Sequence, residues 1–215
     1  MLCAANAIAQ LDQITSREAV SGLKAALEKG SQAAVASLGR LDGFFGNPQV
    51  KIPLPESLQR TERLMRRFGM AKYADELILT LNRAAEAAVP EARQLFLDAV
   101  KKMTVQDAKG ILSGGDTAAT EYFRRTTQDA LRKRFHPIVA KATARVELAA
   151  KYNEYAESAA ALGLVKKEDA NLDDYVTQKA LDGLFFMVAE EEKKIRKDPL
   201  GSASALIRKV FGAIR

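Results

Sequence analysis

A pair of glycines before a predicted helix forms the first candidate site. Two glycines that lead into a helix N-terminus can expose several backbone N–H groups to an anion, and the helix dipole adds to the attraction. We call Ser113–Thr117 the glycine corner. Together with a polar stripe on the following helix, it supplies the candidate ligand-binding residues Gly114, Gly115, Asp116, Thr117, Thr120 and Arg124. These residues favour a carboxylate or phosphate ligand, although the Asp116 carboxylate would compete for the helix end. A capped corner between two helices is the alternative.

A second candidate is a group of polar side chains on a strongly amphipathic segment. Asp75, Asn82 and Glu86 share the face opposite the apolar stripe, and Arg83 can reach Glu86 three residues on. Leu79 interrupts this polar face, which indicates that another helix partly covers it. Covered polar groups need internal partners, so a buried polar network is expected. Acid/base chemistry by Glu86 is the alternative use of the same side chains.

The long C-terminal helical segment carries two further features. Gly183 precedes the apolar residues Phe185 and Phe186, and a glycine inside a helix indicates either close packing or room for a ligand. We favour packing, because Phe commonly fills protein cores. Farther along, Glu192 and Arg196 form a favourable pair four residues apart, which is typical of an exposed helix end.

Most familiar reaction classes lack the residues that they need. The chain has one cysteine, Cys3, and one histidine, His136, far apart in the sequence. These counts exclude an internal disulfide and a zinc site made of Cys and His ligands. No phosphate-binding loop, dinucleotide fingerprint or metal-binding helix motif is present. The sequence therefore predicts no cofactor, no metal and no assigned catalytic residue.

The segments that must position these residues show the periodicity of helices. Apolar residues recur at helical spacing over about 72–89, 116–135 and 173–197, and Pro137 is expected to start or kink a further helix. No period repeats, and no linker rich in Gly, Ser or Pro divides the chain. We expect an all-α fold, a single compact bundle of about seven to eight helices.

Residues 39–55 form the one long irregular stretch. In this segment Val50, Ile52 and Leu54 alternate with polar or proline residues, which predicts an extended chain with one side packed on a core. Pro53 excludes a central strand. We expect a strap, not part of a sheet.

The formal net charge is +6, from 33 Lys and Arg against 27 Asp and Glu. The excess is spread along both halves, and the short basic clusters lie in amphipathic helices, so solvated helix faces explain them and nucleic acid is not the expected partner. No apolar run approaches the roughly 18 residues that cross a bilayer, so no transmembrane segment is expected.

The first ten residues, MLCAANAIAQ, are small and apolar and contain the A-x-A pattern twice. This composition is typical of the end of an export signal. We therefore expect residues 1–10 to be the remnant of an export signal and residues 11–215 to form a single all-helical domain. A disordered N-terminus is the alternative. The expected location is the periplasm, or the cytoplasm if the segment is not a signal remnant.

Several long strings occur in a distinctive order, among them VKIPLPESL at 50–58, DAKGILSGGDTAATEYFRR at 107–125 and YVTQKALDGLFFMVAEEEKKIRKDP at 175–199. In this order and spacing the chain resembles the bacterial domain-of-unknown-function family numbered 4197, from Gln10 onward. The resemblance implies an exported, all-helical protein of Gram-negative bacteria. It implies no particular reaction and supplies no catalytic residue.

The leading hypothesis is a non-enzymatic exported protein that binds a small anionic or amphipathic ligand, or an envelope protein partner. It requires a cavity of several hundred Å³ beside Arg124 or Phe186. The first alternative is an enzyme that uses Asp75, Glu86 or Asp116 as acid or base, which requires at least two of them in one cleft. The second alternative is a basic surface that binds nucleic acid or lipid headgroups. Such binding should weaken steeply as the salt concentration rises.

Overall fold

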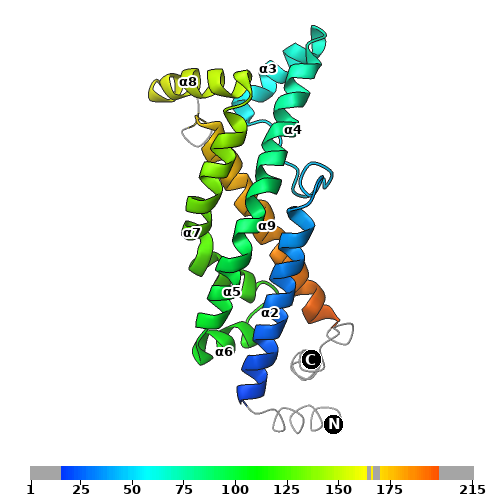
Figure 1. Ribbon diagram of the computed structural model, residues 1–215, viewed down its shortest axis with the longest axis vertical. Coiled ribbons are helices and arrows are strands. Elements are labelled where there is room, and N and C mark those ends of the chain that lie inside the picture. Colours follow the sequence, from blue (N-terminus) through cyan, green and yellow to red (C-terminus); the bar gives the residue numbers. More distant parts are fainter. Residues whose placement is uncertain (1–15, 164–165, 167–169, 199–215) are drawn as a thin grey trace. The chain divides into compact units, whose positions relative to one another are not determined.

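The computed structural model describes residues 16–163, 166 and 170–198. The regular structure in these residues is helical throughout, with no strand, so the all-α prediction is confirmed. In chain order the elements are α2 (Ser16–Leu38), α3 (Glu56–Arg67), α4 (Ala71–Ala88), the 3-10 turn η1 (Val89–Glu91), α5 (Ala92–Lys102), α6 (Val105–Ser113), α7 (Ala118–Thr143), α8 (Glu147–Ala161) and α9 (Leu172–Lys197) (Figure 1). The predicted export remnant at residues 1–10 lies outside the described residues.

The contacts of the chain divide it into two compact units. Among the described residues, unit 1 comprises 16–34, 93–128 and 185–198. Unit 2 comprises 35–92 and 129–184, with residues 164–165 and 167–169 outside the description. Each unit has its own buried core and its own set of polar contacts.

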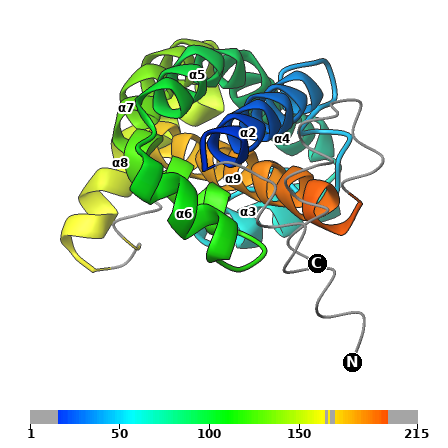
Figure 2. The same ribbon diagram turned by 90° about the horizontal axis from the view of Figure 1, so that it is seen from below.

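Unit 1 is built around stacked aromatic rings. The ring centroids of Phe96 and Phe123 lie 4.7 Å apart, and those of Phe96 and Phe185 lie 6.2 Å apart. All three side chains are fully buried. Tyr122 extends this cluster, and its hydroxyl donates a hydrogen bond to the Ala99 carbonyl at 2.7 Å. Within this unit, α2 and the C-terminal part of α9 lie side by side (Figures 1 and 2).

The strap of residues 39–55 belongs to unit 2 and follows the predicted alternation. Val50, Ile52 and Leu54 are buried, and Lys51 and Pro53 between them are exposed. The segment forms turns and extended chain without any strand. One side of the strap therefore contributes to the core of unit 2, and the other faces solvent.

Helix α4 buries the apolar stripe that its sequence predicts. Ala74, Leu77, Leu81, Ala84, Ala85 and Ala88 are all buried. Tyr73, in the first turn, is instead 58% exposed. Of the two outcomes expected at Pro137, the start of a new helix does not occur: α7 continues through this residue to Thr143, and the interruption falls at residues 144–146.

Candidate functional site

The anion-binding position at the glycine corner is taken by a carboxylate of the chain itself. The backbone N–H groups of Ala119 and Thr120, in the first turn of α7, each donate a hydrogen bond to the Glu192 carboxylate at 2.9 Å. The Thr120 hydroxyl donates to the same carboxylate at 2.9 Å. These N–H groups have no partner inside the helix, and the positive end of the helix dipole favours an anion there. Glu192 therefore occupies the place that the sequence suggested for an external carboxylate or phosphate.

Arg196 holds Glu192 from the opposite side. Its guanidinium donates to Glu192 Oε1 at 3.0 and 2.8 Å and to the carbonyl of Ile111, in α6, at 2.9 Å. The Glu192 and Arg196 side chains are 6% and 13% exposed. The expectation of an exposed helix end was therefore wrong for this pair, because the carboxylate is needed to satisfy the start of α7. Through these contacts α9 is fixed to both helices of the corner.

The two glycines of the corner differ in their surroundings. A Cβ at Gly114 would lie 2.6 Å from Ala118 Cβ and 2.8 Å from the Gly110 carbonyl oxygen, so only glycine fits without a shift of the backbone. The Gly114 N–H donates to the Ile111 carbonyl at 3.3 Å. Gly115 has open space around it. Gly114 therefore serves the tight connection between α6 and α7.

The remaining corner residues do not converge on one point. Asp116 is exposed, and the Thr117 carbonyl accepts the N–H of Glu121 in the first turn of α7. The Arg124 guanidinium lies 4.6 Å from the Phe185 ring centroid, a cation–π contact, and 3.9 Å from the Glu121 carboxylate. Of the six residues proposed from the sequence, Thr120 alone contacts the bound carboxylate.

The polar side chains of α4 hold the strap in unit 2. Glu86 Oε1 accepts the backbone N–H groups of Phe44 and Phe45 at 3.0 and 3.1 Å, and Oε2 accepts from Arg83 at 2.6 Å. Arg83 also donates to Asp42 at 2.8 Å, and its pKa is raised mainly by the hydrogen bond to Glu86. Both Glu86 oxygens are thus engaged in fixing the turn that begins the strap. The structure assigns this carboxylate a positioning contact rather than an open acid/base site.

Asn82 pairs with the extended part of the strap as a neighbouring strand would. Its side-chain oxygen accepts the Ile52 N–H at 2.8 Å, and its amide nitrogen donates to the Ile52 carbonyl at 2.9 Å. A further hydrogen bond joins the amide nitrogen to the Ile78 carbonyl at 2.8 Å. Asn82 is fully buried, so these bonds satisfy backbone groups that solvent cannot reach.

Asp75 does not join these side chains. Its carboxylate is 58% exposed and accepts a hydrogen bond from Arg66 at 2.6 Å. Asp75 and Glu86 therefore bind different arginines, and in the described part of the chain Asp116 contacts neither carboxylate. The arrangement offers no shared carboxylate pair for proton transfer among the described contacts.

Gly183 permits close packing inside unit 2. A Cβ there would lie 2.7 Å from Phe44 Cε1 and 3.3 Å from Val50 Cβ. Both neighbours belong to the strap. The absent side chain is therefore filled by the Phe44 ring, as the packing interpretation expected.

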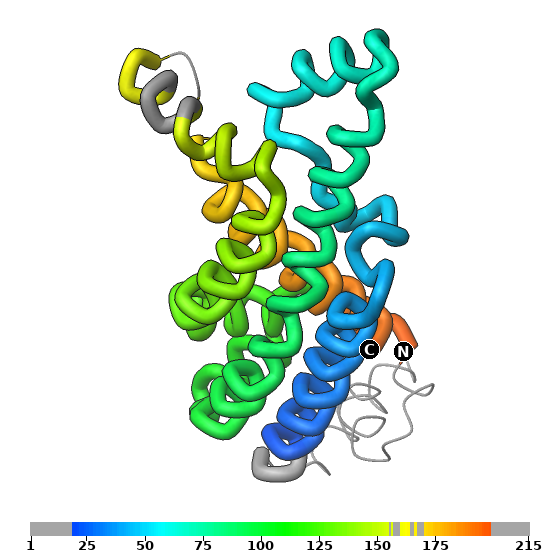
Figure 3. The backbone as a smooth tube through the Cα atoms, turned by 45° about the horizontal axis from the view of Figure 1, so that its top comes forward, coloured from blue at the N-terminus to red at the C-terminus, as the bar shows by residue number. Residues whose placement is uncertain are grey.

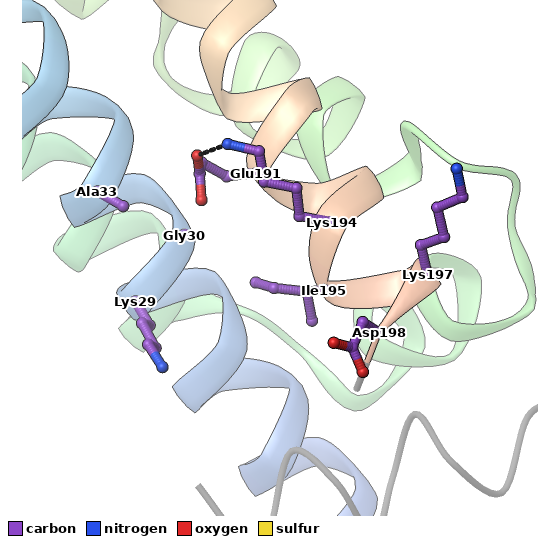
Figure 4. Close-up of a pocket in the computed structure, with 8 residues that line it drawn as sticks. All are labelled: Lys29, Gly30, Ala33, Glu191, Lys194, Ile195, Lys197 and Asp198. Carbon is purple, nitrogen blue, oxygen red and sulfur yellow. Dashed lines mark hydrogen bonds and ion pairs between the residues drawn. The ribbon is translucent and has the colours of Figure 1, made fainter. Parts of the chain in front are cut away.

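A groove in unit 1 is the candidate site that sequence reasoning missed. It has a volume of about 430 Å³, and its walls come from α2 and the last two turns of α9 (Figure 4). The lining residues are Lys29, Gly30, Ala33, Glu191, Lys194, Ile195, Lys197 and Asp198. We call this the α2–α9 groove. No local sequence motif predicts this groove, because its two walls are more than 150 residues apart in the sequence.

Small residues on α2 make room for the groove. Gly30 is buried, and a Cβ there would touch Ile195 Cδ1 at 3.4 Å. Ile195 points from α9 toward α2 and forms the apolar centre of the groove (Figure 4). An adjoining cavity of about 20 Å³ shares Gly30 and Ile195 with it and continues inward to Phe123 and Val188. The groove therefore lies next to the core of unit 1.

Charged side chains border this apolar centre. Lys194 donates to Glu191 at 2.7 Å, so these two charges are paired across one turn of α9. Lys29 and Lys197 have no ion pair with any residue in the described part of the chain. The lining thus combines an apolar centre with Lys29 on α2, with Lys197 and Asp198 at the end of α9, and with the Glu191–Lys194 pair. Glu192, which lines the adjoining cavity, and Arg196 fix the helix that forms this wall.

The described residues offer neither a metal-binding cluster nor a membrane-spanning helix. No group of three or more His, Cys, Asp or Glu side chains lies close enough there to hold a metal ion. No helix in the same residues is long and apolar enough to cross a membrane.

Comparison with models of known protein families identifies the family of this chain. Residues 13–212 match the model described as a protein of unknown function (DUF4197), so the chain belongs to this family. The resemblance drawn from the ordered sequence strings is thereby confirmed. No curated protein and no solved structure matches the chain.

Proposed function

We propose that this member of the DUF4197 family is a binding protein for a single-chain amphipathic anion, which it holds in the α2–α9 groove. The observation that carries the proposal is the apolar centre at Ile195 beside Lys29 and Lys197, within a groove of about 430 Å³. Ligand sites of this kind are concave and mostly apolar, with a few polar groups that fix the orientation of the ligand.

The contacts of unit 1 favour this groove over the glycine corner. At the corner, Glu192 already satisfies two backbone N–H groups and the Thr120 hydroxyl. An external anion there would have to displace a carboxylate that Arg196 also holds. At the groove, Lys29 and Lys197 carry no such internal partner among the described residues. An acyl or alkyl chain would cover Ile195 and Ala33, and its charged end would face a lysine.

Displacement of a fluorescent fatty acid tests the proposal. The probe is 11-(dansylamino)undecanoate, and the competitors are dodecanoate, dodecanol and dodecyltrimethylammonium. We expect dodecanoate to displace the probe and dodecyltrimethylammonium to do so poorly, because the lysines favour an anionic end. Failure of the probe to bind, or equal displacement by the cationic competitor, would contradict the proposal.

A matched pair of variants locates the site. Ala33 and Ala36 are both exposed on α2, and Ala33 alone lines the groove. Ala33→Glu adds bulk and a negative charge at the groove and should weaken probe binding by about tenfold or more, since 1.4 kcal/mol corresponds to a factor of ten. Ala36→Glu should leave the affinity unchanged. Equal affinities of the two variants for the probe would show that the ligand binds outside the α2–α9 groove.

An envelope location completes the proposed function. It is supported by the two A-x-A patterns in residues 1–10, which lie outside the described residues. Fractionation of a Gram-negative host that expresses the native gene tests it, with the intact mass of the purified protein as the second readout. A periplasmic protein cleaved near residue 10 is expected, and an uncleaved cytoplasmic protein would contradict export.

A further inference from the structure

Helix α3 and the turn that follows it expose an unusual amount of apolar surface. No side chain of α3 is buried. Leu64, Phe68, Met70 and Tyr73 are 49%, 71%, 45% and 58% exposed. Figure 3 shows α3 turning back onto α4 through this segment, within unit 2. We call these four residues the α3–α4 tip. Single exposed apolar residues are common on protein surfaces, but a group of large ones within ten residues calls for a partner.

Arginines form a stripe next to the apolar residues of the tip. Arg60, Arg63 and Arg67 recur at offsets of three and seven, so they lie on one face of α3. All three are exposed and make no ion pair with any described residue. Leu64 is four residues after Arg60 and therefore lies beside the stripe. The outward face of α3 is thus cationic along one side and apolar along the next.

The nearby acidic groups do not neutralise this stripe. Glu62 and Asp75 both accept from Arg66, at 2.9 and 2.6 Å. Glu56 is paired with Lys166 at 2.9 Å, and its pKa is lowered by that hydrogen bond. The arginines of the stripe therefore keep their full charge for an external partner.

We propose that the α3–α4 tip docks on an anionic lipid surface. A helix with a basic face beside exposed Leu and Phe side chains is the type that lies in a membrane interface, with the apolar residues among the acyl chains and the arginines at the phosphates. This inference is independent of the ligand proposed for the groove. It assigns a surface of unit 2 to a partner of a different kind.

Two other occupants fit the surface less well. A nucleic acid would meet the arginines, but it would leave Leu64 and Met70 against a charged backbone. A second copy of the chain would cover the apolar residues, but it would bring Arg60, Arg63 and Arg67 of each copy close to the same residues of the other. An anionic bilayer can contact both sides of the tip, the apolar residues with its acyl chains and the arginines with its phosphates.

Vesicle sedimentation of the full chain tests the inference. The vesicles are phosphatidylcholine alone, or phosphatidylcholine with phosphatidylglycerol in equal parts, each at low and at high salt. We expect binding to the anionic vesicles that weakens as the salt concentration rises, and little binding to the neutral ones. Equal binding to both compositions, or no binding to either, would overturn the proposal.

Two double variants separate the cationic from the apolar contribution. Arg60→Glu with Arg67→Glu should weaken binding by about 25-fold or more, since each basic residue near an anionic surface contributes about fivefold. Arg93→Glu with Lys109→Glu makes the same change of net charge at exposed positions elsewhere and should have a much smaller effect. Equal losses for the two pairs would show that net charge alone drives the binding.

The apolar side has its own matched control. Leu64→Ser with Phe68→Ser should weaken vesicle binding by about tenfold or more, because two partly inserted side chains are removed. Leu41→Ser with Leu162→Ser changes two residues that are 73% and 76% exposed elsewhere, and it should leave binding unchanged. These substitutions are all at exposed positions, so the helical circular dichroism of each variant should match the parent protein.

The same purified variants distinguish the other occupants. Binding to a duplex DNA oligonucleotide without binding to anionic vesicles would overturn the inference in favour of nucleic acid. A dimer that depends on Phe68, seen by light scattering and without vesicle binding, would overturn it in favour of self-association.

Discussion

Replacement of Glu192 by glutamine is the sharpest test of the packing of unit 1. The wild-type carboxylate accepts two backbone N–H groups and one hydroxyl from the start of α7 and is also bound by Arg196. Glutamine keeps the shape, but its NH₂ group must face one of these donors, and Arg196 loses the negative charge of Glu192. Breaking a buried ion pair by removing one member costs about 3–5 kcal/mol. We expect Glu192→Gln to lower the free energy of unfolding by about this amount.

A neighbouring residue supplies the matched control. Glu191 is one position away on α9 and pairs with Lys194, whose side chain is 66% exposed. Exposed ion pairs contribute about 0–1 kcal/mol, so Glu191→Gln should change stability by less than about 1 kcal/mol. Urea unfolding followed by circular dichroism measures both variants, and a loss of 3–5 kcal/mol corresponds to a midpoint shift of about 1–2 M or more. Equal midpoints for the two variants would refute the role given to Glu192.

Chemical rescue gives a second readout of the same contact. Glu192→Ala removes the carboxylate that the start of α7 and Arg196 both contact. We expect sodium acetate to restore part of the lost stability, whereas sodium chloride at the same ionic strength does not. No difference between the two salts would contradict an anion requirement at this helix end.

Three further expectations concern the strap, a tight contact and pH. Asn82→Ala should destabilise the protein by about 2–5 kcal/mol in urea unfolding, because it leaves buried backbone groups of the strap without partners. A loss of stability below about 1 kcal/mol would contradict the role of Asn82 in holding the strap. Gly183→Ala should be destabilising by about 1–3 kcal/mol, since its Cβ would lie 2.7 Å from the Phe44 ring, and a neutral or stabilising effect would show that the ring moves freely. The hydrogen bond from the Thr104 hydroxyl lowers the pKa of Asp107, so this carboxylate stabilises the fold above its unfolded-state pKa and loses that effect as the pH falls through the lowered folded-state value. Asp107→Asn should therefore be less stable than the parent protein near neutral pH and approach it in acid, and a difference that does not change with pH would contradict the account.

Local patterns were sufficient to predict the helices and the strap. The alternation of Val50, Ile52 and Leu54 needs no tertiary information, because it depends on a period of two along an extended chain. The boundary between α7 and α8 was predicted too early in the sequence, because Pro137 lies inside α7 and does not start the next helix. The break at residues 144–146 has no comparable signal in the sequence.

The partners of the polar residues could not be predicted from spacing. The sequence suggested an external anion at the start of α7, whereas the carboxylate found there belongs to Glu192, which is 72 residues beyond Thr120 in the sequence. The Glu192–Arg196 pair matches the pattern of a solvated helix end, and only the fold shows that it is buried. The role of Asn82 likewise depends on its hydrogen bond with Ile52, which is distant in the sequence. Tertiary contacts of this kind carry no local signature.

The α2–α9 groove was also beyond sequence reasoning. Gly30 and Ala33 belong to no recognisable motif, and the structure shows that the space beside them is only partly filled by Ile195. The exposure of the α3–α4 tip is similar, because Tyr73 continues an apolar stripe by spacing and yet is 58% exposed.

Photo-crosslinking is the most direct test of the proposed ligand site. A dodecanoate analogue with a diazirine near the end of its chain is irradiated with the purified protein, and the modified peptides are identified by mass spectrometry. The account requires labels on the α2 segment around Lys29 and Ala33 and on the α9 segment around Ile195, with loss of both on addition of excess dodecanoate. Labels that concentrate on other helices, or that persist with excess dodecanoate, would contradict it.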